Sequence, residues 1–329
     1  MQKYKANFKQ ALLSELFPGI IHISPNQRKV TATSNSPFTP YTLLAIVTLA
    51  QQFFPPGVLQ ALSGDDALGP WLTAHPLVEK ISFTGSTFTG KKVMQSTAGT
   101  MKRITLELGG NDPAIVFDDV DIEGTAQKIC MCVKRIYVHS SVYTVFRDAI
   151  ARAVNKFSVG NGLDPGVTHG PVQNALQYSN VREFLIDAEK EGQHVVVGGE
   201  IPPELGSAQN YFINPTIIDE LHDEARLVVE EPFGPVLPLL SFDTEEDLIP
   251  RVNATRTGLA ASVWTTDLIR GRRVAENLEV GTVWINRHLG LKPGIPFAGW
   301  KESGFGCEFG KDGLQEWCRA KVIFLQKSK

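Results

Sequence analysis

The stretch K-I-S-F-T-G-S-T-F-T-G-K-K-V-M-Q, residues 80–95, decides the fold class. Its first four residues predict a strand, Gly85 marks a turn, and residues 87–95 predict a helix. A strand that passes through a glycine turn into a helix is half of a βαβ unit, which favours a parallel sheet covered by helices. The stretch therefore predicts an α/β fold.

The same alternation of strands and helices continues on both sides of this stretch. Upstream, the pattern predicts helices over residues 43–53 and 68–73 and a short strand over 58–62. Downstream, a strand ends at Glu107 and further α/β units follow. We expect those units to contain helices from residue 121 and over 142–157, 181–191, 245–252, 268–278 and 311–317, and strands over 114–117, 136–139, 195–197, 260–264, 283–286 and 322–325.

Composition narrows the class of protein. A chain of 329 residues with 43% hydrophobic content can bury a large core and divide into about two domains. The net charge of −3 gives no electrostatic basis for binding nucleic acid or an anionic membrane, so neither is an expected partner. The spacing of the cysteines fits neither a disulfide framework nor a metal site, so we expect no metal and a reducing, cytoplasmic setting; they are Cys130, Cys132, Cys307 and Cys318.

Two residues suggest the chemistry. Glu107 lies in I-T-L-E-L-G-G-N, residues 104–111, where a strand ends before two glycines, and Cys130 follows downstream. A partly desolvated carboxylate can take a proton from water, and a cysteine is a nucleophile when its surroundings favour the thiolate. Together they suggest acyl chemistry on a carbonyl. Each also has an ordinary interpretation, since Glu107 could be a charged strand end and Cys130 a buried apolar filler.

Five motifs occur in the order found in the aldehyde dehydrogenase superfamily, and the chain resembles a member of it from about residue 36 to residue 327. They are F-T-G-S-T-F-T-G (83–90), L-E-L-G-G-N (106–111), C-x-x-x-x-R (130–135), E-E-P-F-G-P-V (230–236) and P-F-A-G-W-K-E-S-G-F-G (296–306). The resemblance implies a partial Rossmann-type nucleotide-binding domain at residues 1–107, of which 1–35 match poorly, an α/β catalytic domain at 108–305, and a subunit-pairing tail at 306–329.

The resemblance also assigns roles. It implies NAD(P)-dependent oxidation of a small aldehyde to a carboxylic acid, with NAD favoured and with a homodimer or tetramer as the assembly. Cys130 would be the nucleophile, because Arg135 stands five positions after it as the family pattern requires, and Glu107 would be the general base. The residues implied to contact the cofactor are Ser36, Gly85, Ser86, Gly90, Leu108, Glu231 and Phe233.

Some of these residues fit plainer roles equally well. Ser86 could be only the N-cap of the helix that follows, a position that serine commonly fills. The segment around Glu231 and Phe233 could be a connector between a strand and a turn.

The chain departs from the family pattern at three places. The segment from Asp121 to Cys130 is about eleven residues shorter than the pattern, Ser34 and Pro37 stand where a Lys and a Glu hold the adenosine ribose, and the Asn of the W-N-F-P segment is not found. These departures leave open a second hypothesis, in which cofactor binding is weakened and the chain is a catalytically impaired or inactive relative or an incomplete gene product.

Overall fold

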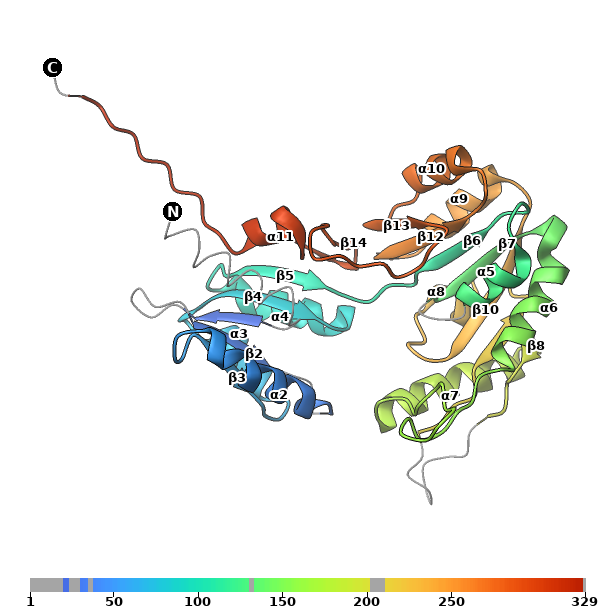
Figure 1. Cartoon of the computed structure of the whole chain (residues 1–329), viewed down its shortest axis with the longest axis horizontal. Helices are drawn as coiled ribbons and strands as arrows, with labels where there is room; N and C mark the ends of the chain where they lie inside the picture. The colour runs from blue at the N-terminus through green and yellow to red at the C-terminus, as the bar shows by residue number, and fades with distance from the viewer. Residues whose placement is uncertain (1–19, 24–29, 35–37, 130–132, 202–210, 328–329) are drawn as a thin grey trace. The chain divides into compact units, whose positions relative to one another are not determined.

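A computed structural model of the protein describes residues 20–23, 30–34, 38–129, 133–201 and 211–327. The chain divides into two compact units, both of them α/β (Figure 1). Unit 1 comprises residues 1–108, 291–299 and 304–329, and unit 2 comprises residues 109–290 and 300–303. The main chain thus passes from unit 1 to unit 2 between Leu108 and Gly109, directly after the strand that carries Glu107.

Unit 1 is built on a six-stranded sheet with the order β15-β5-β4-β1-β2-β3. Strands β4 and β5 run parallel, and β15 pairs antiparallel with β5, so that Gly304 lies opposite Glu107. Its strands are β1 (Ile20–Ile23), β2 (Val30–Ser34), β3 (Leu59–Leu62), β4 (Val78–Thr84), β5 (Arg103–Glu107) and β15 (Gly304–Phe305), and its helices are α2 (Pro40–Ala50), η1 (Gln51–Phe53), α3 (Leu68–Ala74), α4 (Thr87–Ala98) and α11 (Gly310–Glu316).

The two faces of the β4–β5 pair differ in polarity. Side chains alternate along a strand, so Ile81 and Leu106 share one face, where they pack with Val93 of α4. The opposite face carries Lys80 and Ser82 of β4 and Thr105 and Glu107 of β5. Glu107 therefore projects from the polar face of the sheet.

Unit 2 contains a seven-stranded sheet with the order β13-β12-β6-β7-β10-β9-β8, and a two-stranded sheet formed by β11 and β14. Its strands are β6 (Pro113–Val116), β7 (Arg135–His139), β8 (His194–Val197), β9 (Thr216–Asp219), β10 (Val236–Phe242), β11 (Thr257–Gly258), β12 (Ala260–Trp264), β13 (Thr282–Ile285) and β14 (Trp300–Lys301). Its helices are α5 (Ile122–Ile129), η2 (Ser140–Val142), α6 (Tyr143–Val154), α7 (Ala175–Lys190), α8 (Arg226–Val229), α9 (Glu245–Asn253) and α10 (Leu268–Glu276).

Helices cover both faces of the large sheet (Figure 1). Helices α5 and α6 bury Ile129 and Phe146 on one face, whereas α9 and α10 bury Leu248 and Val274 on the other. Strands β6, β7 and β10 are neighbours and run parallel, so the segments that enter them meet at one edge of the sheet.

The outer strand β8 pairs antiparallel with β9 and is irregular. Its register shifts between Val195 and Val197, and Gly198 and Gly199 follow with φ of +76° and +84°. A side chain at Gly198 would meet the carbonyl oxygen of Pro215 at 2.4 Å, so glycine is required there.

Most predicted helices and strands are present, with shifted ends. Helix α7 begins at Ala175 rather than near residue 181, because the Asn174 side chain caps it by accepting a hydrogen bond from the Gln177 amide at 2.9 Å. Strands β9 and β10 were not among the predicted elements.

The predicted strand at residues 322–325 is wrong. Val322, Ile323, Phe324 and Leu325 have no regular secondary structure and are 69–93% exposed. A strand needs a neighbour to complete its hydrogen bonds, and within the described residues this segment pairs with none.

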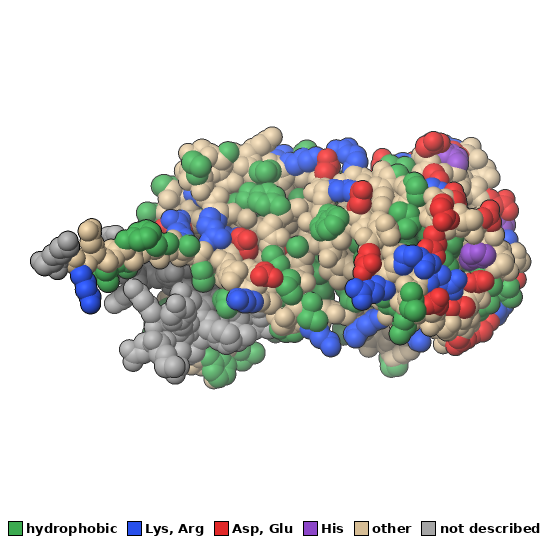
Figure 2. All heavy atoms as spheres, turned by 90° about the horizontal axis from the view of Figure 1, so that it is seen from above, with side chains coloured by type: hydrophobic (Ala, Val, Ile, Leu, Met, Phe, Trp, Pro, Cys, Tyr) green, Lys and Arg blue, Asp and Glu red, His purple; other side chains and the backbone are tan. Residues whose placement is uncertain are grey.

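Surface charge is mixed on the face of unit 2 that Figure 2 shows, where acidic and basic side chains are interspersed. Within the described residues, no helix combines the length and the apolar character needed to cross a bilayer.

Candidate active site

Glu107 ends β5 as a buried carboxylate, only 5% exposed. Neither carboxylate oxygen has a hydrogen-bond partner within the described residues. Desolvation, followed by the nearby charge of Glu308, raises the pKa of Glu107 to about 8. An unpartnered buried carboxyl group costs stability and is therefore a candidate for a functional group.

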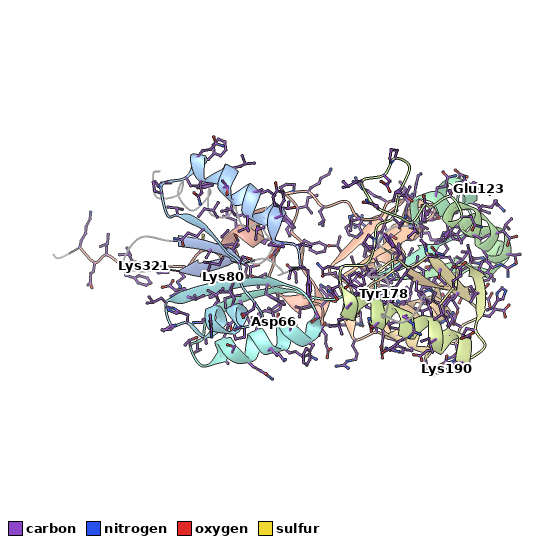
Figure 3. The ribbon with its side chains drawn as sticks, turned by 90° about the horizontal axis from the view of Figure 1, so that it is seen from below. Asp66, Lys80, Glu123, Tyr178, Lys190 and Lys321 are labelled. Atoms are coloured by element: carbon purple, nitrogen blue, oxygen red, sulfur yellow. The ribbon has the colours of Figure 1, made fainter. Side chains whose placement is uncertain are left out.

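Polar side chains in unit 1 share the face of the β4–β5 pair that carries Glu107. Ser82 donates a hydrogen bond to Glu308, and Lys80, labelled in Figure 3, donates to Thr105. Lys80 also lies 3.7 Å from the Glu316 carboxylate, and burial lowers its pKa to about 8. The segment from β15 to α11 thus supplies acids to the polar face of β4 and β5.

Ser86 occupies the N-cap of α4, directly after β4. Its hydroxyl oxygen accepts a hydrogen bond from the Thr89 amide at 3.2 Å, so the N-cap interpretation is confirmed. Helix α4 is 12 residues long and has no acidic residue in its first turn. Such a helix end offers amide groups and a positive dipole to an anion, which is compatible with a phosphate.

Gly85, Gly90 and Leu108 lie in one packed region of unit 1. The Gly85 amide donates to the Glu107 carbonyl at 3.0 Å, which ties the turn after β4 to the end of β5. A side chain at Gly90 would meet Leu108 at 2.5 Å, so this glycine lets α4 approach Leu108. Their expected contacts with a cofactor stay a prediction.

The loop that follows in unit 2, residues 109–111, is held from several sides. Ser303 donates to the Gly109 carbonyl at 2.6 Å, and Arg135 Nε donates to the Asn111 carbonyl at 2.9 Å. The side-chain amide of Asn111 donates a hydrogen bond to the Val228 carbonyl at 2.8 Å. Ser303, Arg135 and Asn111 all belong to the sequence motifs, and in the structure they fix this turn.

Glu231 is tied to the same loop. Its Oε2 accepts a hydrogen bond from the Gly110 amide at 3.1 Å, and its Oε1 lies 3.7 Å from Lys134 Nζ. Burial raises the pKa of Glu231, and Lys134 and the Gly110 amide oppose the rise. Phe233 is 65% exposed, and the Lys134 ammonium lies 4.9 Å from the centre of its ring.

Two predicted site residues, Cys130 and Ser36, lie outside the described residues. The residues that flank the thiol are described. Ile129 ends α5 with no exposed surface and Val133 is 2% exposed, and both belong to the core cluster beneath α5 and α6. Three residues, 130–132, therefore connect two points that are anchored in the core.

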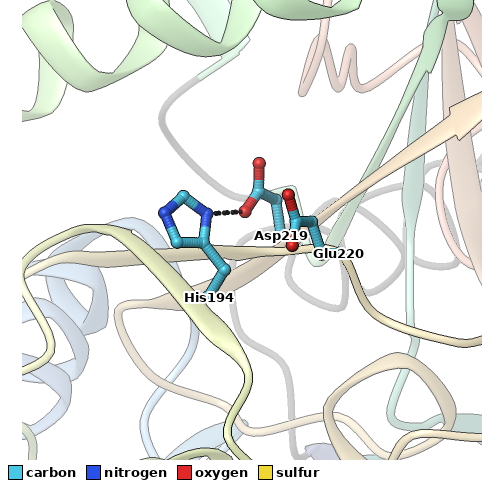
Figure 4. A group of neighbouring side chains, drawn as sticks. All are labelled: His194, Asp219 and Glu220. Carbon is cyan, nitrogen blue, oxygen red and sulfur yellow. Dashed lines mark hydrogen bonds and ion pairs between the residues drawn. The ribbon is translucent and has the colours of Figure 1, made fainter.

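A second polar cluster in unit 2 consists of His194, Asp219 and Glu220, whose ligand atoms lie within 4.8 Å of one another (Figure 4). The buried Asp219 carboxylate forms a hydrogen bond with His194 and lies 3.6 Å from the Arg147 guanidinium. Because Arg147 already balances the charge of Asp219, the cluster is better suited to ion pairing than to a divalent cation.

Sequence reasoning missed Glu308, Asn111 and Lys134. Glu308 and Asn111 follow or end recognised motifs, but their burial and partners depend on segments distant in the chain. Lys134 lies within the recognised motif of residues 130–135, directly before Arg135, which was a usable signal.

Comparison with known proteins matches residues 33–323 to the aldehyde dehydrogenase family. Aldehyde dehydrogenase LUC3 of a Fusarium species is 41% identical over 303 residues, covering 89% of this chain and 64% of the relative. Succinate-semialdehyde dehydrogenase [NADP(+)] 1 of Schizosaccharomyces pombe is 41% identical over 301 residues, covering 87% of this chain and 60% of the relative. The chain thus spans less than two thirds of the length of these relatives.

Solved structures give the same result. Betaine aldehyde dehydrogenase from Staphylococcus aureus in complex with NAD+ matches with a TM-score of 0.80 and 34% identity, covering 87% of this chain and 59% of that one. An NADP-dependent enzyme of Escherichia coli matches with a TM-score of 0.80 and 38% identity, covering 87% and 61%.

Proposed function

Because the chain belongs to the aldehyde dehydrogenase family, we propose that it oxidises a small aldehyde to a carboxylic acid with NAD(P)+. Glu107 carries this proposal. A buried carboxylate with no partner within the described residues is costly to maintain, and a pKa near 8 suits a general base that must bind and release protons near neutral pH.

The proposed reaction uses two side chains of this protein. The Cys130 thiolate attacks the aldehyde carbon to form a thiohemiacetal, which becomes a thioester when the carbon loses a hydride. Bound NAD(P)+ supplies the acceptor for that hydride. Glu107 then takes a proton from a water molecule, whose oxygen attacks the thioester carbon, and the carbon–sulfur bond breaks to release the carboxylic acid and the Cys130 thiolate.

Glu308 raises the pKa of Glu107, the proposed general base. Its carboxyl group is partly buried beside Glu107 and accepts a hydrogen bond from Ser82. A second negative charge nearby raises the pKa of Glu107 further, so a larger fraction of Glu107 is protonated at neutral pH. Turnover should therefore rise with pH as Glu107 ionises.

Different groups are proposed for the two ends of the cofactor. The N-terminal turn of α4, with Ser86 at its cap, fits the pyrophosphate, and Glu231 and Phe233 fit the ribose and ring of the nicotinamide end. Ser34 replaces the expected Lys, which weakens the adenosine end. We favour NAD over NADP, as in the resemblance, although the relatives include enzymes of both kinds.

The alternative proposal, a catalytically impaired relative, rests on the short thiol segment. Ile129 and Val133 are both anchored in one core cluster, so only three residues are available to deliver the Cys130 sulfur to a substrate. Misplacement of a nucleophile by about 1 Å costs about a hundredfold in rate.

Absorbance of NAD(P)H tests the two proposals. The purified chain is mixed with NAD+ or NADP+ and with short, long and aromatic aldehydes. The dehydrogenase proposal predicts reduction that is lost in Cys130→Ala, kept in the matched control Cys132→Ala, and lowered about 10²–10⁴-fold in Glu107→Gln. No reduction with any aldehyde would reject it in favour of the impaired relative.

Assembly and location are further proposals. Residues 306–329 are expected to pair subunits into a homodimer or tetramer, and their exposed apolar end supports this. The half-buried thiols of Cys307 and Cys318 are free, which suits a reducing compartment such as the cytoplasm. Light scattering of the purified chain tests the assembly.

A further inference from the structure

Lys134 lies between the two residues of unit 2 that the proposed function places on the cofactor. Its Nζ is 3.7 Å from Glu231 Oε1 and 4.9 Å from the centre of the Phe233 ring. Its backbone amide donates to the Asp112 carbonyl at 2.9 Å, which anchors it at the entry of β7. One ammonium group thus contacts a carboxylate and an aromatic ring on the same loop.

The loop that carries these two groups is under backbone strain. Phe233 has a φ of +48°, a left-handed conformation that costs a non-glycine residue about 1 kcal/mol or more. Gln177 of α7 donates to the Pro232 and Phe233 carbonyls at 2.8 and 3.0 Å. These contacts fix the main chain of the loop, but they do not reach the Phe233 ring.

The contacts of Gln177 do not orient the Phe233 ring or the Glu231 carboxylate. Phe233 is 65% exposed, so packing alone leaves its ring free to rotate. The side chains of Lys134 and Glu231 are 20% and 19% exposed, so their attraction is less screened than that of a surface pair. At 3.7 Å the ammonium partly balances the charge of Glu231 Oε1, and a carboxylate oxygen has two lone pairs, so that oxygen can still accept a hydrogen bond from a ligand.

We propose that Lys134 is a positioning residue, which orients the Glu231 carboxylate and the Phe233 ring for the nicotinamide half of the cofactor. This inference rests on the proposed function, because it presumes that Glu231 and Phe233 contact the cofactor. It assigns Lys134 no contact with the reacting atoms.

Calorimetric titration of the full chain with NAD+ and with AMP tests the assignment. Lys134→Met keeps the aliphatic stem and removes the charge, and it should weaken NAD+ binding about tenfold while AMP binding stays unchanged. Lys134→Arg should restore NAD+ binding to within about threefold, because it keeps the cation. The matched control is Lys301→Met, which removes a similarly buried lysine paired with Glu279 at 2.7 Å and should leave both ligands unaffected.

A second measurement uses the protein without any ligand. Carbon NMR of glutamate-labelled protein, with the Glu231 signal assigned from Glu231→Gln, should show the Glu231 pKa rising in Lys134→Met and not in Lys301→Met. In steady-state kinetics, Lys134→Met should raise the KM for NAD+ and leave kcat within about threefold, which a general loss of structure would not do.

The outcomes separate this inference from the function on which it rests. If the unaltered chain does not bind NAD+, the proposed function fails and the inference falls with it. If it binds NAD+ and Lys134→Met binds equally well, or loses AMP in proportion, only the positioning role is overturned. Should Lys134→Met not unfold cooperatively, Lys134→Gln takes its place with the same expected results.

Discussion

Glu107 and Arg135 are both buried charged residues, but their surroundings differ. Arg135 is 2% exposed and its guanidinium donates to the Asn111 carbonyl, the Tyr137 hydroxyl and the Val252 carbonyl, at 2.9, 3.1 and 3.3 Å. Glu107 is 5% exposed, and its carboxylate oxygens have no hydrogen-bond partner within the described residues. A group with three partners holds structure together, whereas a group with none is available to a substrate.

The burial of Glu107 predicts a pH-dependent effect of Glu107→Gln on stability. The pKa of Glu107 is raised from 4.5 to about 8, so between these values the unfolded chain has released a proton that the folded chain still binds. The free energy of unfolding of the unaltered protein should therefore fall as pH rises through this window, by up to about 1.4 kcal/mol per pH unit from this group. The variant lacks this contribution.

Urea unfolding at about pH 5 and about pH 7.5 measures the difference. Glu107→Gln should gain stability relative to the unaltered protein at the higher pH. Glu246→Gln, at an exposed position on α9, serves as the control and should follow the unaltered protein. A constant difference across the two pH values would contradict a raised pKa.

Some of the site could be read at the residue scale and some could not. Glu107, Ser86 and Glu231 could be singled out as candidates because their motifs are local in sequence. Lys80 and Glu308 were not, because a lysine or glutamate is ordinarily exposed, and their burial depends on a C-terminal segment more than 200 residues away, as the Ser82–Glu308 bond shows.

At the scale of elements, the presence of a helix follows from sequence better than its first residue or the edge strands of a sheet do. Helix α9 begins at its predicted residue, Glu245, behind a Thr244 cap. Helix α7 begins earlier than predicted because the Asn174 cap and the buried Tyr178 extend it upstream of Val181. Strand β9 escaped prediction because four buried residues carry no alternation.

The two N-caps give a matched pair of predictions. Ser86→Ala removes the acceptor for the Thr89 amide on α4, and Thr244→Ala removes the acceptor for the Asp247 amide on α9, each at 3.2 Å. Each should cost about 1 kcal/mol in the free energy of unfolding. Only Ser86→Ala should also weaken NAD+ binding in a calorimetric titration. Equal affinities in the two variants would remove Ser86 from the cofactor site.

Helix α6 provides a second matched pair, at adjacent residues. Phe146 has no exposed surface, whereas Val145 is 55% exposed. Phe146→Ala should lower the free energy of unfolding by about 3–5 kcal/mol because it leaves a cavity between α6 and the sheet. Val145→Ala should change it by less than about 0.5 kcal/mol. Chemical denaturation of both variants measures the contrast. Similar losses of stability would contradict the burial of Phe146, rather than Val145, against the sheet.

At the scale of the whole chain, the C-terminal segments return to unit 1. Residues 291–299, which the sequence prediction grouped with the catalytic domain, belong to unit 1 together with 304–329. The pairing of β15 with β5 explains this grouping, and a two-residue strand gives almost no signal in sequence. The assignment of the units to cofactor binding and catalysis stays a prediction.

The exposed apolar end of the chain predicts concentration-dependent association. Ile323 and Phe324 are 69% and 93% exposed, so replacing both by Ser removes no packing and should change stability by less than about 0.5 kcal/mol. The double variant should scatter less light at high protein concentration, because less apolar surface is available for contact between molecules. Leu163→Ser, at an isolated 92% exposed position, is the control. Unchanged scattering in the double variant would exclude this segment as the surface through which the molecules associate.

The irregular edge strand β8 affects whether a strand of another molecule can pair with the large sheet. Its displaced pairing at Val195 and the two consecutive glycines beyond it turn the backbone out of plane at the rim. A peptide from another molecule that paired with this edge strand could match its backbone hydrogen-bond donors and acceptors over only a few residues. The edge strand β8 is thus expected to resist fibril-like growth through its own main-chain geometry.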